Sequence, residues 1–231
     1  MLTAYDYPFA RALDEAGIDI VLVGDSLGNV ALGYRNTLPV TMNEMIVHTQ
    51  AVARAVNRAL VVADLPFGSY QESDDKAVAN AVKLVKAGAA AVKLEGAGYL
   101  SAIRRIVTAG IPVMGHLGFT PQSVNVLGYR VQGQGAQEAK RLWREAKELE
   151  KAGCFALVLE LMPEELAAKI TKAVKVPTIG IGAGGKTDGQ VLVTNDLLGL
   201  YPEPPSFVRP KLRLRETVLK AVKEYIKETK G

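Results

Sequence analysis

The chain is poor in cysteine, histidine and aromatic residues: its 231 residues include one cysteine, Cys154, two histidines and 6% Phe, Trp and Tyr. A single cysteine excludes an intrachain disulfide, and the sequence has no Cys/His cluster of the kind that binds zinc. Cys154 precedes apolar residues, so we expect a small buried side chain there. No apolar run approaches the ~20 residues that span a bilayer, and no signal peptide is recognisable. We therefore expect a cytoplasmic protein without a membrane partner.

Long runs of one charge sign are also missing, because 28 basic and 24 acidic residues leave a net charge of +4. The most basic stretch lies near the C-terminus, where apolar residues recur at helical spacing: Val218, Leu219, Val222 and Ile226. We predict an amphipathic helix over residues 212–229 with a solvated Lys/Glu face. The interleaved glutamates, and the lack of any DNA- or RNA-binding motif, argue against a nucleic-acid partner.

The chain does contain eight short apolar runs separated by helix-like segments. The runs do not alternate apolar and polar residues, which is typical of strands covered on both faces in a parallel sheet. The predicted strands are Met1–Tyr5, Ile20–Asp25, Leu60–Asp64, Ala90–Glu95, Ile111–His116, Phe155–Glu160, Val176–Gly182 and Gln190–Val193. Between them, segments such as "DDKAVANAVKLVKAG" have the apolar spacing and the residue propensities of helices.

A local repeat supports this alternation of strand and helix. Four stretches run from a helix end through Ala-Gly into a short strand that closes on a polar group: 15–25, 86–95, 108–116 and 151–160. Eight βα units predict an α/β fold, a (β/α)8 TIM barrel, with a doubly wound open sheet as the alternative. We expect one domain over residues 1–231, with a linker at 199–210 before the C-terminal helix.

Five successive predicted strands end on an ionisable side chain: Asp25, Asp64, Glu95, His116 and Glu160. In a parallel barrel all of these ends open on one mouth, where active sites form. Any single acid could instead cap the following helix, and Asp64 before Leu-Pro fits that interpretation. Several carboxylates crowded at one mouth repel one another, and a bound cation relieves that repulsion. Carboxylate oxygens favour Mg²⁺ or another hard divalent ion over zinc.

Other polar residues are predicted to face the same mouth. Lys93 lies two residues before Glu95 and so shares its strand face. Its ammonium could bind a substrate carboxylate, form a Schiff base, or simply pair with Glu95 or Glu160. Ser26 could donate to the same anion, and His116 could hold a carboxylate or a substrate oxygen. His48 lies in a helical pattern and is predicted to be structural.

The glycine-rich stretch "GIGAGG" (180–185) fits a dinucleotide-binding fingerprint only weakly. It follows the seventh predicted strand, and "KTDGQ" stands where an apolar helix should open. We interpret it as a backbone loop at the barrel mouth.

A family resemblance rests on collinear motifs: "MLTAYDYPFA", "LVGDSLGNV", "TLPVT", "VVADLPFGSY", "VKLEG", "GIPVMGHLGFTPQSVN", "YRVQG" and "PTIGIGAG…DGQVLV". With these stretches, which run from residue 1 to about 200, the chain resembles the ketopantoate hydroxymethyltransferases of pantothenate synthesis. The resemblance implies a phosphoenolpyruvate-mutase-like barrel that transfers a one-carbon unit from 5,10-methylenetetrahydrofolate to 3-methyl-2-oxobutanoate. It also implies a homo-oligomer, a decamer.

By the same resemblance, Asp25, Asp64 and Glu95 belong to a Mg²⁺ site, directly or through water. Ser26 and Lys93 match positions that bind the substrate carboxylate, and Glu160 matches the general base. Asp25, Asp64 and His116 are further candidates for substrate contact. The loop around Gln122, Ser123 and Tyr129 is a candidate folate site. The alternatives are a Mg²⁺-dependent C–C or P–C lyase for another 2-oxo acid, a Schiff-base aldolase that uses Lys93, and a non-enzymatic scaffold or anion-binding barrel.

Overall fold

The computed structural model describes residues 1–201 and 203–230. Contacts within it define two compact units, Met1–Val191 and Leu192–Gly231, and each unit is described by itself. The single domain expected over residues 1–231 therefore stays a prediction.

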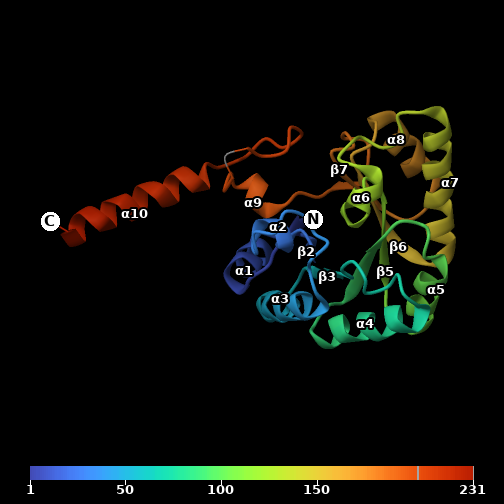
Figure 1. Cartoon of the computed structure of the whole chain (residues 1–231), viewed down its shortest axis with the longest axis horizontal. Coiled ribbons are helices and arrows are strands. Elements are labelled where there is room, and N and C mark those ends of the chain that lie inside the picture. Colours follow the sequence, from blue (N-terminus) through green and yellow to red (C-terminus); the bar gives the residue numbers. More distant parts are fainter. Residues whose placement is uncertain (202, 231) are drawn as a thin grey trace. The chain divides into compact units, whose positions relative to one another are not determined.

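The first unit is built on a sheet of eight parallel strands whose spatial order is their chain order (Figure 1). The strands are β1 (Leu2–Thr3), β2 (Ile20–Val23), β3 (Leu60–Asp64), β4 (Ala91–Glu95), β5 (Val113–Gly118), β6 (Cys154–Glu160), β7 (Thr178–Ile181) and β8 (Gly189–Gln190). The amino group of Met1 donates to the Gln190 carbonyl at 3.0 Å, which brings the first and last strands together. The predicted α/β barrel is confirmed.

Only β3 has the predicted bounds. Two of the differences concern predicted strand ends at the site, since β2 ends at Val23, two residues before Asp25, and β5 runs to Gly118, two residues beyond His116. The first and the eighth predicted strands also differ. The eighth lies at Gly189–Gln190 instead of Gln190–Val193, although the Val191 N–H still donates to the Gly180 carbonyl at 2.9 Å. The first covers only Leu2–Thr3, because Asp6 already caps the next helix by accepting from the Phe9 N–H at 2.9 Å.

Helices follow most of the strands. They are α1 (Tyr7–Glu15), α2 (Leu27–Val30), α3 (Met42–Ala55), α4 (Asp74–Lys86), α5 (Leu100–Thr108), α6 (Val124–Leu127), α7 (Ala136–Ala152) and α8 (Glu164–Ala173), with a 3₁₀ turn η1 (Pro121–Ser123). Of these, α1, α3 and α4 begin with a side-chain cap. Thr41 and Glu44 form a reciprocal capping box at α3, and Ser73 caps α4 by accepting from the Lys76 N–H.

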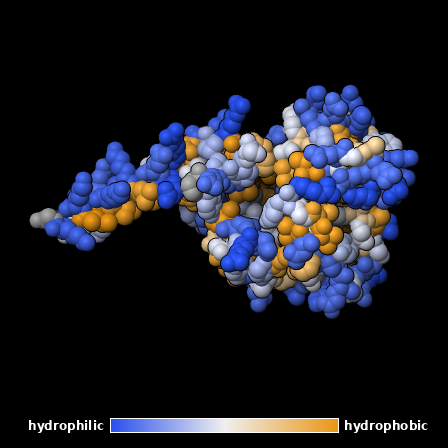
Figure 2. Space-filling model, turned by 45° about the horizontal axis from the view of Figure 1, so that its top comes forward, coloured by the Kyte–Doolittle hydropathy of each residue, from blue (hydrophilic) through white to orange (hydrophobic). Residues whose placement is uncertain are grey.

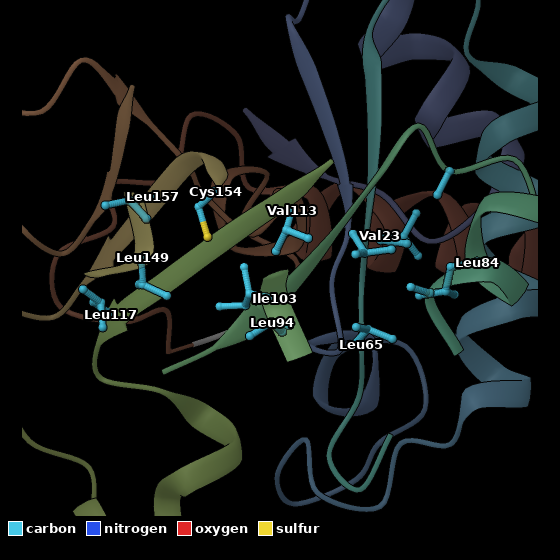
Figure 3. Close-up of a cluster of buried hydrophobic side chains, with 14 of the residues drawn as sticks. Val23, Leu65, Leu84, Leu94, Ile103, Val113, Leu117, Leu149, Cys154 and Leu157 are labelled. Carbon is cyan, nitrogen blue, oxygen red and sulfur yellow. The ribbon is translucent and has the colours of Figure 1, made fainter. Parts of the chain in front are cut away.

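The core consists of two clusters on opposite faces of the strands. Since side chains alternate along a strand, Val92 and Leu94 pack outward in the cluster between sheet and helices, part of which Figure 3 shows. Ala91 packs inward in a smaller cluster with Leu22 and Met114. Both faces are apolar because both are covered, which explains the continuous hydrophobic runs.

Asp14 links helix α1 to the residues just before β3. The carboxylate of Asp14, near the end of α1, accepts three backbone N–H groups, those of Asn57, Arg58 and Ala59, at 2.8–3.1 Å. These donors, led by Ala59, hold the pKa of Asp14 below its ordinary value.

The second unit contains α9 (Thr194–Leu197) and α10 (Leu214–Lys230). The predicted C-terminal helix is therefore present, beginning two residues later than expected. No residue of α10 is buried, and apolar residues such as Val222 and Ile226 form a stripe along it, visible in Figure 2. Among the described residues, no helix combines the length and apolar character needed to cross a bilayer.

Candidate active site

Strand register brings the polar strand ends to one level of the barrel. Asp64 is the Cα partner of Lys93, and Glu95 is the partner of His116. These four polar residues each lie an even number of positions after an apolar residue of the same strand that faces inward. Lys93 and Glu95, for example, lie two and four positions after Ala91. The period of two therefore aims these side chains into the barrel above its inner apolar cluster.

Asp25, Asp64 and Lys93 form one side of the site. The Asp25 N–H donates to Asp64 Oδ2 at 3.0 Å. The helix that follows Asp64, α4, has Ser73 as its N-cap, so Asp64 does not cap it. Lys93 Nζ lies 3.0 Å from Asp64 Oδ1 in a buried ion pair whose side chains are 5% and 3% exposed. Asp64 Oδ1 has no hydrogen-bond partner among the described residues, so its contact with Lys93 is an ion pair without the geometry of a hydrogen bond. Lys93 thus pairs with Asp64, which was not among the partners considered from the sequence.

Burial dominates the electrostatics of this side. It raises the pKa of Asp25 well above its ordinary value, and the charges of Asp64 and Glu95 raise it further. It raises the pKa of Asp64 too, although Lys93 opposes that shift. For Lys93 burial lowers the pKa, but the surrounding acids outweigh it and the net pKa is raised. The ammonium is therefore charged.

His116 joins the buried acids to Glu160. Its Nδ1 lies 3.4 Å from Glu95 Oε1 and 3.5 Å from Lys93 Nζ, and its Nε2 lies 3.2 Å from Glu160 Oε2, off the line of a hydrogen bond. Burial and Lys93 lower the pKa of His116, but the carboxylates of Glu160 and Glu95 outweigh them and raise it to about 9. The ring is therefore an imidazolium between two acids at neutral pH.

Glu160 differs from the other acids because its side chain is 17% exposed. The backbone around it is tightly constrained. Gly118 has φ +97°, and a Cβ there would stand 2.0 Å from the Glu160 carbonyl oxygen. Leu161, directly after Glu160, has φ +44°, a conformation that is strained for leucine. Its N–H donates to the Ile181 carbonyl and its carbonyl accepts from Gln132, which holds the strained residue in place.

Ser26 and His48 both contact Tyr5, at a second side of the site. Ser26 occupies the N-cap position of α2 without a side-chain capping bond, and its Oγ lies 2.8 Å from the Tyr5 hydroxyl. His48 Nδ1 lies 2.5 Å from the Tyr5 carbonyl, which fits the structural role expected for it. Tyr5, a buried aromatic residue whose hydroxyl contacts Ser26, was not among the residues predicted for the site.

Two further residues enter the site from loops. Gln122, in η1, donates its side-chain N–H to Asp25 and its backbone N–H to Glu95, while Tyr70 donates to its amide oxygen. Within the candidate folate loop, the side-chain amide of Gln122 is therefore already engaged by Asp25, the Leu65 carbonyl and Tyr70. Beside Glu95, a cavity of about 290 Å³ is lined by the β4–α5 loop, Ser123 and Val126, among other residues.

The donor set suits a hard cation: carboxylate oxygens, one of them buried without a hydrogen bond among the described residues. Within residues 1–201 and 203–230, no three His, Cys, Asp or Glu side chains are arranged to hold one ion together. The residues thus fit an ion such as Mg²⁺, which keeps water in its shell, better than one held by an all-protein cage. The "GIGAGG" stretch leads from β7 to β8 and opens no helix, unlike a dinucleotide site.

Solved structures place the barrel in a known structural class. A phosphonopyruvate hydrolase in complex with oxalate and Mg²⁺ superposes with a TM-score of 0.67 at 13% identity, over 98% of this chain and 80% of that one. A 2,3-dimethylmalate lyase, described as a member of the PEP mutase/isocitrate lyase superfamily, gives 0.64 at 15% identity, over 99% and 92%. At such identities the likeness shows the fold: a barrel of the PEP mutase/isocitrate lyase type.

Sequence comparison then identifies the family. The family model for ketopantoate hydroxymethyltransferase matches residues 1–231. Proteins named 3-methyl-2-oxobutanoate hydroxymethyltransferase from Pyrococcus furiosus and Thermotoga maritima are 54% and 55% identical, over 100% of this chain and 82% and 86% of those proteins. The chain belongs to the ketopantoate hydroxymethyltransferase family, a family of transferase enzymes.

Proposed function

We propose that this chain transfers a hydroxymethyl group from 5,10-methylenetetrahydrofolate to 3-methyl-2-oxobutanoate, forming 2-dehydropantoate (ketopantoate) for pantothenate and coenzyme A synthesis. Glu160 removes the C3 proton of the oxo acid. The resulting C3 nucleophile bonds to the folate-bound one-carbon unit, water supplies the hydroxyl oxygen, and tetrahydrofolate leaves.

The observation that carries this proposal is the difference between Glu160 and the three buried acids. The Glu160 side chain is 17% exposed, and its Oε2 lies 3.2 Å from His116 Nε2, while Glu95 contacts the other nitrogen of the same ring. A base must reach a substrate carbon, whereas groups that bind a cation can be fully enclosed. The His116 imidazolium, held between Glu160 and Glu95, keeps the Glu160 carboxylate oriented.

Asp25, Asp64 and Glu95 are proposed to hold Mg²⁺ directly or through water. When bound, the ion would offset negative charge that develops on the keto oxygen as the proton leaves. A positioned base contributes only about 10²–10⁴-fold to such a step, so charge stabilisation must supply much of the rest.

Ser26 and Lys93 are proposed to bind the substrate carboxylate. Among the described residues, Asp64 alone lies within ion-pair distance of the Lys93 ammonium, so the ammonium can approach a second anion. The Ser26 hydroxyl can donate outward while it accepts from Tyr5. His116 and the acids Asp25 and Asp64 line the space next to the bound oxo acid.

The enzymatic alternatives fit the site less well. A Schiff-base aldolase needs an uncharged lysine, and the raised pKa of Lys93 opposes that. Lyases with this fold commonly use a cysteine in a mouth loop, whereas Cys154 is buried at the start of β6. A scaffold would not need an accessible acid beside a buried imidazolium.

The test is a product assay by NMR with purified protein and 3-methyl-2-oxobutanoate. We expect ketopantoate only when methylenetetrahydrofolate and Mg²⁺ are both present, loss of turnover with EDTA, and recovery with excess Mg²⁺. Turnover that survives EDTA, together with borohydride trapping of substrate on Lys93, would instead establish the aldolase.

We propose a cytoplasmic homo-oligomer, a decamer by family resemblance, whose partners are the small 2-oxo acid and the folate. Sedimentation velocity tests the assembly: a monomer at micromolar concentration contradicts it.

A further inference from the structure

A buried glutamine connects two of the acids that come from different strands. Gln122 is 5% exposed and lies in η1, beyond the end of β5. Its backbone N–H donates to Glu95 Oε2 at 2.9 Å, and its side-chain Nε2 donates to Asp25 Oδ2 at 2.8 Å. Nε2 also donates to the Leu65 carbonyl at 2.9 Å. One residue therefore supplies an uncharged donor to each of two buried carboxylates.

The orientation of the Gln122 amide is fixed by its neighbours. The Tyr70 hydroxyl accepts from the Glu95 N–H at 3.2 Å and donates to Gln122 Oε1 at 2.7 Å. Gln71 Nε2 points at the same oxygen from 3.3 Å. A flipped amide would set oxygen against the Asp25 carboxylate and the Leu65 carbonyl, and nitrogen against Gln71, so the network selects one orientation.

We propose that Gln122 is a positioning residue that sets the spacing of Asp25 and Glu95, with Tyr70 locking its amide. The inference rests on the proposed function, in which both acids belong to the cation site. A chain of hydrogen bonds ties the backbone of β4 to the carboxylate that follows β2. It runs from the Glu95 N–H to the Tyr70 hydroxyl, then to the Gln122 amide and finally to Asp25. Without it, two like-charged groups lose their common donor and move apart.

The experiment measures Mn²⁺ binding by EPR titration and C3–H exchange of 3-methyl-2-oxobutanoate in D₂O at saturating Mn²⁺. Gln122→Met keeps the side-chain length and the backbone N–H but removes the side-chain amide, both its N–H donors and its oxygen acceptor. We expect the dissociation constant for Mn²⁺ to rise about 10–100-fold, as for other groups that orient metal ligands, and exchange to stay slow at saturating metal. Tyr70→Phe removes the lock and the acceptor of the Glu95 N–H but leaves both donors of Gln122 in place, so it should change both quantities in the same direction by less.

Gln132→Met is the matched control because Gln132 is also fully buried but contacts none of the three acids in the described structure. It should leave the Mn²⁺ dissociation constant unchanged, whatever it does to the melting temperature. If Gln122→Met does not fold, as judged by circular dichroism, Tyr70→Phe decides.

Wild-type Mn²⁺ affinity and exchange in the folded Gln122 and Tyr70 variants would overturn the inference while leaving the proposed function intact. A wild-type protein that neither binds Mn²⁺ nor exchanges the C3 proton would overturn the proposed function, and this inference with it.

Discussion

The buried ion pair between Lys93 and Asp64 gives the strongest stability prediction. Its atoms are 3.0 Å apart and both side chains are at most 5% exposed. At that distance and an effective dielectric constant of about 20, the Coulomb attraction is ~5–6 kcal/mol. Removing one partner of such a pair typically costs ~3–5 kcal/mol, because the other charge stays buried alone. Lys93→Met should therefore lower the free energy of unfolding by ~3–5 kcal/mol.

Urea unfolding measures this loss, followed by circular dichroism and by fluorescence of the single tryptophan, Trp143. Lys76→Met is the matched control, since it breaks an exposed pair with Glu72 and should cost at most ~0.5 kcal/mol. Adding Asp64→Asn to Lys93→Met should recover part of the loss, because it removes the stranded carboxylate. A double variant that loses the full sum of both single changes, or a Lys93→Met loss as small as the control's, would refute the reasoning.

Three further predictions concern residues around the site and the core. Gly118 and Gly96 both have positive φ, so an alanine at either position is strained, and Gly96→Ala should cost ~1–2 kcal/mol. Gly118→Ala should cost more, because its Cβ would also collide with the Glu160 carbonyl; thermal melting of both variants measures the difference. Asp14 contributes stability that is present above its unfolded pKa and lost as pH falls through its lowered folded pKa, so Asp14→Asn should flatten the acid limb of a stability–pH curve. Cys154, buried with a pKa raised to about 12, should react with DTNB at pH 8 only after unfolding, and rapid native reaction would contradict its burial.

Much of the site could be predicted because it follows from local sequence. An apolar run that closes on an acid identified the strand ends at Asp64, Glu95 and Glu160 correctly, whereas β2 ends two residues before Asp25. The period of two then places Lys93 on the face of Glu95 without any knowledge of the fold. The barrel follows from repetition of the same unit.

Contacts between strands could not be predicted in the same way. The partner of Lys93 depends on the register of β3 against β4, and that register selects Asp64 over Glu95 or Glu160. The role of Gln122 depends on the fold of η1 at the mouth. The hydrogen bond that holds its amide comes from Tyr70, which lies on a loop 52 residues earlier in the chain. The last strand is too short for a distinct apolar run, so its bounds were wrong.

The central claim is that Glu160 takes the C3 proton beside a cation site formed by the buried acids. Proton NMR of 3-methyl-2-oxobutanoate in D₂O with Mg²⁺ tests it most directly. The wild-type protein should exchange the C3 proton for deuterium without folate, and Glu160→Gln should slow that exchange by about 10²–10⁴-fold while still binding metal. Exchange at the wild-type rate in Glu160→Gln would contradict the assignment.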